Sequence, residues 1–232
     1  DIQRSRGLGD VYKRQGSYHL LKHNKGKGVM IGHMDAMDPR VVTVIGAGVA
    51  GTQSILKAID NKALVKVVDS SQSKLDDLKL KYGTENVEYI LSSKDSIQVS
   101  VNESDLVIGS VYVVGKEAPK VVTKDMLSSM NPGTVMVDVS IDQGGCFETS
   151  KPTTHDSPTF LENDIVHYCV TNMPGAVPLT ATEALNKVSL SYVENLANNG
   201  IQNALESDEH LRNGLNILDG RIVHPGVKEA LE

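Results

Sequence analysis

The sequence predicts an α/β protein in which a doubly wound parallel sheet is followed by a helical C-terminal segment. Three observations predict this architecture. Short β-branched apolar runs alternate with segments of helical periodicity, the first clear run meets a glycine-rich turn, and strand-like runs stop near Pro178. With 232 residues, 40% of them hydrophobic, the chain is long enough to bury the core that such a fold requires.

The strands are predicted from runs of Val, Ile and Leu that end in turn residues. Alternation of such runs with helical segments is typical of βαβ units, whose strands lie parallel in one sheet. We expect strands at residues 40–45, 63–69, 87–91, 104–111, 133–141 and 165–170.

The helices are predicted from apolar residues at a spacing of three or four. Thr180 and Glu183 have the spacing of a capping box, and Asn199 with Gly200 would end the helix that they begin. A hairpin is predicted at 217–223. We expect helices at 16–28, 48–61, 71–83, 180–199 and 201–214, and a last helical turn at 225–232.

Composition and charge exclude several classes of function. The net charge is −6 with no long run of one sign, which argues against a nucleic-acid partner. No apolar stretch approaches the roughly 18 residues of a membrane helix, and the first 15 residues lack the apolar core of a signal peptide. Cys146 and Cys169 form no CxxC motif, so we expect reduced thiols in a cytoplasmic protein, although a disulfide is also compatible with the sequence.

A glycine-rich turn gives the strongest functional signal. Gly46, Gly48 and Gly51 form a G-x-G-x-x-G motif between a predicted strand and a predicted helix. In a Rossmann-type domain the first glycine permits a tight turn, the second lets the backbone approach a pyrophosphate, and the third lets helix and strand pack closely. Asp69 ends the next predicted strand, where its carboxylate can bind a ribose hydroxyl and repel a 2′-phosphate. The motif therefore predicts NAD rather than NADP; the alternative is a glycine-rich turn without a ligand.

Polar residues follow other predicted strands at the edge of the sheet where ligands of open α/β sheets lie. Asp142 follows the strand at 133–141 and could hold a water or accept a proton beside a nicotinamide. Asn172 lies in the loop after the last strand of the sheet. We expect Gly144 and Gly145 to let the backbone approach a ligand. The alternative for this edge is ordinary turn chemistry.

Other chemically active side chains are interpreted as structural. His155 and His167 lie near the same edge but have no metal-ligand spacing, so no metal site is predicted. Asp138 lies inside the predicted strand and is expected to serve structure. The two cysteines have no visible base partner and are expected to be packing residues.

Four stretches carry a family resemblance: VTVIGAGVAGTQ, DLVIGSV, VDVSIDQGGCFETSKPTTH and VHYCVTNMPGAVPLTATEAL. They resemble bacterial L-alanine dehydrogenases, of the alanine dehydrogenase and pyridine nucleotide transhydrogenase family, from about Gly16 to the C-terminus. The resemblance implies NAD-dependent, reversible oxidative deamination of L-alanine to pyruvate and ammonia. It also implies a homo-oligomer, a hexamer in the family, with a small-molecule substrate.

The resemblance further implies roles for individual residues. Asp142 matches the family's catalytic aspartate. Tyr112 and Ser140 depart from the small aliphatic residue and the alanine that are usual at those positions. The residues that match cofactor contacts are Gly46, Gly48, Gly51, Asp69, Ser92, Val111, Tyr112, Val139, Asn172 and Met173.

The resemblance also implies a division of the chain. Family members carry an N-terminal substrate domain without a counterpart in this sequence, and residues 1–15 match nothing in the family. We expect a non-native leader at 1–15, an NAD-binding Rossmann domain at 16–178 and, at 179–232, a helical segment that would pack on the substrate domain. Such a chain is expected to be inactive alone. The alternatives are a transhydrogenase-type NAD(H)-binding subunit and a non-catalytic NAD-binding module.

Overall fold

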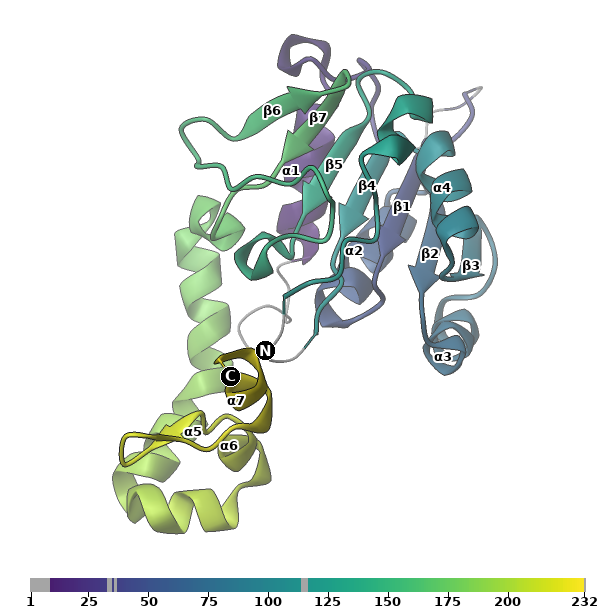
Figure 1. Ribbon diagram of the computed structural model, residues 1–232. Helices are drawn as coiled ribbons and strands as arrows, with labels where there is room; N and C mark the ends of the chain where they lie inside the picture. The colour runs from purple at the N-terminus through teal and green to yellow at the C-terminus, as the bar shows by residue number, and fades with distance from the viewer. Residues whose placement is uncertain (1–8, 33–34, 36, 114–116, 232) are drawn as a thin grey trace.

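A seven-stranded sheet forms the centre of the protein, in the order β3-β2-β1-β4-β5-β7-β6 (Figure 1). The structure, a computed structural model, describes residues 9–32, 35, 37–113 and 117–231. Neighbouring strands are parallel except for β6, which is antiparallel to β7. The predicted fold class is confirmed. The strands are β1 (Val41–Ile45), β2 (Leu64–Asp69), β3 (Val87–Leu91), β4 (Leu106–Gly109), β5 (Val135–Asp138), β6 (Thr159–Glu162) and β7 (Ile165–Tyr168).

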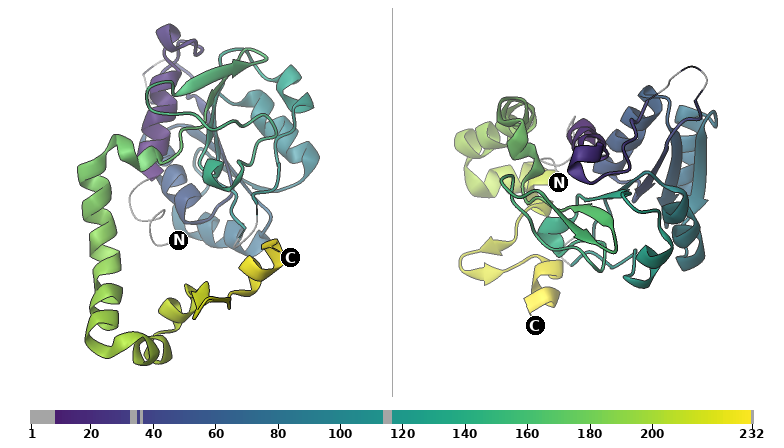
Figure 2. Two further views of the ribbon diagram at one scale, coloured as in Figure 1. Left: turned by 60° about the vertical axis from the view of Figure 1, so that its left-hand side comes forward. Right: turned by 90° about the horizontal axis from the view of Figure 1, so that it is seen from above.

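Helices cover both faces of the sheet, which explains why the central strands are apolar on both sides (Figure 2). Ile55 and Leu75 from α2 and α3 join one core, together with side chains of α1. Val101 from α4 joins a second core on the opposite face, with Phe147. These helices are α1 (Gly9–His19), α2 (Val49–Asp60), α3 (Gln72–Tyr82) and α4 (Lys94–Glu103).

The first helix begins earlier than the sequence pattern predicts. A helix is expected at residues 16–28, but α1 begins at Gly9 and already ends at His19, and Tyr12 is buried in the first core. The helix therefore crosses the expected boundary between residues 15 and 16. Residues 1–8 of the expected leader lie outside the described residues.

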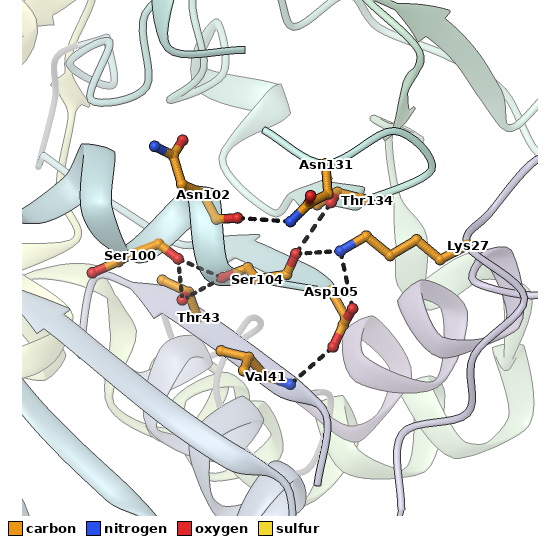
Figure 3. A network of polar contacts seen from close by, with 9 residues as sticks. All are labelled: Lys27, Val41, Thr43, Ser100, Asn102, Ser104, Asp105, Asn131 and Thr134. Atoms are coloured by element: carbon orange, nitrogen blue, oxygen red, sulfur yellow. Dashed lines mark hydrogen bonds and ion pairs between the residues drawn. The ribbon is translucent and has the colours of Figure 1, made fainter. Parts of the chain in front are cut away.

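A polar network ties the strands together at the edge opposite their carboxyl ends (Figure 3). Lys27 donates its ammonium to the carboxylate of Asp105 at 2.9 Å and to the carbonyl oxygen of Ser104 at 2.8 Å. Asp105 also accepts the backbone N–H of Val41 at 3.1 Å, and Thr134 donates its hydroxyl to the Ser104 carbonyl at 3.1 Å. These bonds fix the starts of β1, β4 and β5 relative to one another. The carboxyl ends of the three strands are therefore also held in fixed relative positions.

The C-terminal segment extends from the sheet as an arm (Figures 1 and 2). The predicted capping box at Thr180 is wrong, because the first helix of the arm begins two residues earlier, at Pro178. Proline suits the first turn, where its missing N–H has no intrahelical partner to lose. The predicted break at Gly200 is confirmed by its φ of 73° and ψ of 167°. The arm comprises α5 (Pro178–Ser207), α6 (Glu209–Asn213), the hairpin of β8 (Ile217–Leu218) and β9 (Arg221–Ile222), and α7 (Pro225–Leu231).

None of the helices in the described part of the chain has the length and apolar character needed to cross a membrane. The longest helical segment, α5, spans 30 residues, but it is broken at Gly200 and carries polar side chains throughout.

Candidate functional site

The glycine motif forms a tight turn between β1 and α2. Gly46 has a φ of +95°, which favours glycine, and a Cβ there would lie 2.7 Å from the carbonyl oxygen of Ser110. A Cβ at Gly51 would lie 1.9 Å from the carbonyl oxygen of Gly46, so the packing of the helix on the turn requires glycine. At Gly48 a Cβ would meet no atom within 4 Å. The three glycines thus provide a turn, an open approach and close packing, in the order that the motif predicts.

Two side chains hold this turn in place. Ser110, directly after β4, donates its hydroxyl to the carbonyl oxygen of Gly46 at 2.7 Å. Asp69, the last residue of β2, accepts the backbone N–H of Ala47 at 2.7 Å and that of Ser71 at 2.9 Å, one on each carboxylate oxygen. Asp69 is 7% exposed. Its carboxylate therefore joins the glycine turn to the start of α3, a role that the sequence pattern does not predict.

A cleft of about 280 Å³ opens over the turn; we name it the glycine-turn cleft. Of the predicted cofactor residues, Gly51, Ser92, Asn172 and Met173 do not line it. Gly51 packs beneath the turn, and the backbone N–H of Ser92 is bonded to the carbonyl oxygen of Asp69 at 2.9 Å. The predicted residues that do line it are Gly46, Gly48, Asp69, Val111, Tyr112 and Val139.

Four further polar residues line the glycine-turn cleft that are not among the predicted cofactor contacts: Ser70, Lys74, Ser110 and Ser140. Lys74 lies in the first turn of α3, and a basic residue just after a strand that ends in Asp69 is the signal that could have identified it. The roles of Ser110 and Ser140 depend on the hydrogen bonds of loops that meet only in the fold.

A second cavity, of about 230 Å³, adjoins the first, because Val139 lines both. We name it the Asp142 cavity. Asp142, Asn172 and Met173 line it. The structure thus brings together the two residues that the strand pattern assigned to one edge, Asp142 and Asn172, and Met173, which the family resemblance implied. They meet because β5 and β7, the strands that precede them, are neighbours in the sheet. Asn172 has a φ of +55°, which places it at the sharp start of the turn that Met173 continues.

Asp142 lies on a short 3₁₀ turn, η4 (Ile141–Gln143), and is exposed at its tip. The strand predicted to reach residue 141 ends at Asp138, because the Asp138 carboxylate accepts the N–H of Ser140 at 3.0 Å and bends the chain. The expectation that Gly145 faces a ligand is wrong. A Cβ on Gly145 would lie 2.7 Å from a carboxylate oxygen of Asp138, inside the protein.

The cysteines and histidines near this edge have structural surroundings. Cys146 and Cys169 are free and buried. Burial, reinforced by the charge of Asp138, raises the pKa of Cys146 well above its usual value and that of Cys169 to about 12, so neither thiol is a nucleophile at neutral pH. Burial lowers the pKa of His167, whose ring bonds Thr149 at 2.8 Å. No group of three or more His, Cys, Asp or Glu side chains among the described residues could hold a metal.

The chain is similar in sequence to known proteins along almost its whole length. The profile of the family described as alanine dehydrogenase/PNT, C-terminal domain, matches residues 13–225. An alanine dehydrogenase of Halomonas elongata is 46% identical over 222 residues, which make up 96% of this chain. The chain spans about 60% of the length of the curated relatives that it matches.

Solved structures show the same similarity. An L-alanine dehydrogenase superposes with a TM-score of 0.87 at 40% identity, over 99% of this chain and 62% of that one. A transhydrogenase from Sinorhizobium meliloti superposes with a TM-score of 0.71, over 96% of this chain and 64% of that one. At 21% identity, the second similarity shows the fold alone.

Proposed function

The chain belongs to the alanine dehydrogenase/PNT C-terminal domain family, and on this basis we propose that it serves the NAD-dependent, reversible oxidative deamination of L-alanine to pyruvate and ammonia. One observation carries the proposal. The glycine-turn cleft, which lies over a G-x-G-x-x-G turn, adjoins a cavity that presents the carboxylate of Asp142. An oxidoreductase needs a cofactor site and a proton-transferring group side by side.

The residues of the glycine-turn cleft fit NAD. Gly48 is the N-cap of α2 and makes no side-chain cap, so N–H groups of the first helical turn lack a side-chain acceptor beside open space. Such a helix N-terminus favours the negative charge of a pyrophosphate. Asp69 lines the same cleft and offers a carboxylate to the ribose. The cofactor is NAD rather than NADP, since a 2′-phosphate beside Asp69 would meet a like charge.

Asp142 would manage protons during the reaction. Bound NAD supplies the hydride acceptor. Loss of the hydride from the Cα atom of alanine and of a proton from its nitrogen leaves an imine, and water then adds to the imine carbon. That water must lose a proton before ammonia leaves and the carbonyl of pyruvate forms. The exposed carboxylate of Asp142 can hold the water and accept its proton.

Neighbouring residues would shape the space in which this chemistry occurs. Val139 lies between the two cavities, where its side chain can pack against the nicotinamide. The amide of Asn172 can donate a hydrogen bond to the carboxamide of the nicotinamide or to the substrate. Met173 lines the Asp142 cavity with a buried apolar side chain. These assignments follow from the positions of the residues around the Asp142 cavity.

Assembly and location are part of the proposal. We place a domain boundary at residues 178 and 179, where α5 leaves the sheet, and assign the arm to packing on a substrate domain or on other subunits of a homo-oligomer. Leu179, Val193 and Ile201 are 73%, 57% and 60% exposed along α5, which supports an interface role. Two free, buried cysteines support the reducing cytoplasm as the location.

The proposal is tested first by binding and then by turnover. NADH and NADPH are titrated against the chain, and nicotinamide fluorescence reports binding. Alanine-dependent formation of NADH is then measured for the chain alone and for the chain joined to the N-terminal part of a relative. We expect binding of NADH by the chain and turnover by the joined protein. NADH binding without alanine-dependent turnover in either protein would favour the non-catalytic module, and hydride exchange between nucleotides would favour the transhydrogenase.

A further inference from the structure

We infer that Asp138 is a positioning residue. Its buried carboxylate accepts hydrogen bonds from both ends of the turn at residues 139–145 and so holds the two ends together. This inference deepens the proposed function, because the turn carries Val139 and Asp142 to the two cavities. Asp138 itself lines neither cavity and is 0% exposed, so it acts through the turn rather than on a ligand.

The two oxygens of the Asp138 carboxylate bind opposite ends of the turn. One accepts the backbone N–H of Ser140 at 3.0 Å, at the start of the turn. The other accepts the N–H groups of Cys146 at 2.9 Å and Phe147 at 3.3 Å, directly after its end. The hydroxyl of Ser150 donates to this second oxygen at 2.5 Å. Within the described residues Asp138 has no ion-pair partner, so these neutral donors stabilise its buried charge.

The outer side of the turn has supports of its own. Lys120 donates its ammonium to the carbonyl oxygens of Gly144 and Gly145, and the backbone N–H of Ala118 bonds the carbonyl oxygen of Gln143 at 2.9 Å. Ser140 donates its hydroxyl to the carbonyl oxygen of Val111 at 2.7 Å. The turn is therefore held between Asp138 on its inner side and Val111, Ala118 and Lys120 on its outer side. A backbone bond from the N–H of Gly145 to the carbonyl oxygen of Ser140, at 3.0 Å, also joins its two ends, and Asp138 extends this closure to Cys146 and Phe147.

The geometry requires a carboxylate at this position. An asparagine has the same shape but keeps a single acceptor oxygen, and its NH₂ group would face an N–H group of the turn. Asp138→Asn should therefore weaken the hold on one end of the turn, while the backbone bond from Gly145 to Ser140 remains. The loosened end displaces Val139 and Ser140, which line the glycine-turn cleft.

A substitution at Gly145 is an independent way to disturb the hydrogen bonds between Asp138 and the turn. Gly144 and Gly145 have φ values of +83° and +77°, so an alanine at either position incurs similar left-handed backbone strain. A Cβ at Gly145 would lie 2.7 Å from the Asp138 carboxylate, whereas a Cβ at Gly144 meets nothing closer than 3.8 Å. Gly144→Ala is therefore a matched control for Gly145→Ala.

The test compares two ligands that share one half of the cofactor. ADP-ribose contains the pyrophosphate and adenosine, which the glycine turn and Asp69 would hold, but lacks the nicotinamide that would reach Val139. We expect Asp138→Asn and Gly145→Ala to weaken NADH binding about tenfold, equivalent to ~1.4 kcal/mol, and ADP-ribose binding less than about twofold. Gly144→Ala and Ser150→Ala, which leave the three backbone bonds to Asp138 in place, should weaken neither ligand selectively.

Hydrogen exchange in the unmutated chain provides a measurement that does not depend on how a variant folds. The amides of Ser140 and Cys146 should exchange as slowly as those of β5, because both donate to a buried acceptor. Fast exchange of these amides, or equal loss of NADH and ADP-ribose binding in the two variants, would overturn the role of Asp138. An unmutated chain that binds neither ligand would instead overturn the proposed function, whatever the exchange rates show.

Discussion

Replacing Asp69 by alanine should narrow the preference of this chain for NADH over NADPH. The substitution removes a carboxylate from the glycine-turn cleft and also removes the acceptor for the N–H groups of Ala47 and Ser71. Both losses disfavour NADH, whose ribose would lose its partner. For NADPH the first loss is favourable, because the 2′-phosphate no longer meets a like charge. Lys74, which lines the same cleft, would then attract that phosphate.

The size of the effect follows from the bonds involved. A hydrogen bond to a charged group contributes about 1.5–3 kcal/mol, so loss of the ribose bond should weaken NADH binding roughly 10- to 150-fold. Ala47 is 7% exposed and does not line the cleft, so the loss of its acceptor disturbs the glycine turn and weakens the binding of both nucleotides alike. NADPH should lose less, and the difference between the two ligands should shrink by about 1–3 kcal/mol.

The assay is a fluorescence titration of each nucleotide against the unmutated chain, Asp69→Ala and Asp69→Asn. The asparagine variant keeps an acceptor for one N–H of the turn while losing the charge, so it should narrow the preference with less loss of thermal stability. Equal affinities for NADH and NADPH in the unmutated chain would refute the ribose role of Asp69. If Asp69→Ala weakened both nucleotides equally, the residue would serve only to hold the glycine turn.

Three further predictions address other parts of the site. In a catalytically active protein containing this chain, Asp142→Asn should lower kcat by roughly 10²–10⁴ with little change in NADH affinity, and near-normal turnover would make Asp142 a turn residue. Gly51→Ala should lower the free energy of unfolding by about 1–3 kcal/mol, because its Cβ would collide with the turn. Gly48→Ala, whose Cβ faces open space, should leave Tm unchanged and still abolish NADH binding. Thermal unfolding measures the first effect and nucleotide titration the second. Because burial raises the pKa of Cys169 to about 12, the unfolded thiol ionises first as pH rises. Urea titrations should therefore show stability falling between about pH 8.5 and 12, and falling less in Cys169→Ala.

The parts of the fold that the sequence predicts are those with strong local signals. The β1–α2–β2 unit is marked by β-branched runs and a glycine motif, and the order of its elements needs no tertiary information. β6 was missed because it has four residues, none of them fully buried, and therefore no hydrophobic pattern. α4 was missed because it mixes Ile, Val and Ser. Its capping box pairs Ser93 with Ser96, without the glutamate or glutamine that usually marks one.

The sequence predicts where in the fold the site lies, but not which residues contact one another there. Parallel strands bring their carboxyl ends to one edge of the sheet, so the sequence alone assigns Asp142 and Asn172 to the same region. Lys120 lies outside both cavities, and its bonds to the turn that carries Asp142 depend on a loop whose path no periodicity describes.

Asp69 and Asp138 show why an acidic residue at the end of a strand is ambiguous in sequence. Each is the last residue of its strand, and each accepts the N–H two residues ahead on one oxygen: Ser71 at 2.9 Å and Ser140 at 3.0 Å. Each also binds a more distant N–H on the other oxygen: Ala47 at 2.7 Å and Cys146 at 2.9 Å.

What separates the two aspartates is their position relative to the glycine-turn cleft. Asp69 lines the cleft, so its carboxylate can hold a turn and still meet a ribose. Asp138 is wholly buried and meets only the protein. The same local hydrogen bonding is therefore compatible with two proposed roles, a ligand contact for Asp69 and a support for the turn of Asp142 in the case of Asp138. Removal of Asp69 should change which nucleotide binds, whereas removal of Asp138 should change how well the nicotinamide half is held.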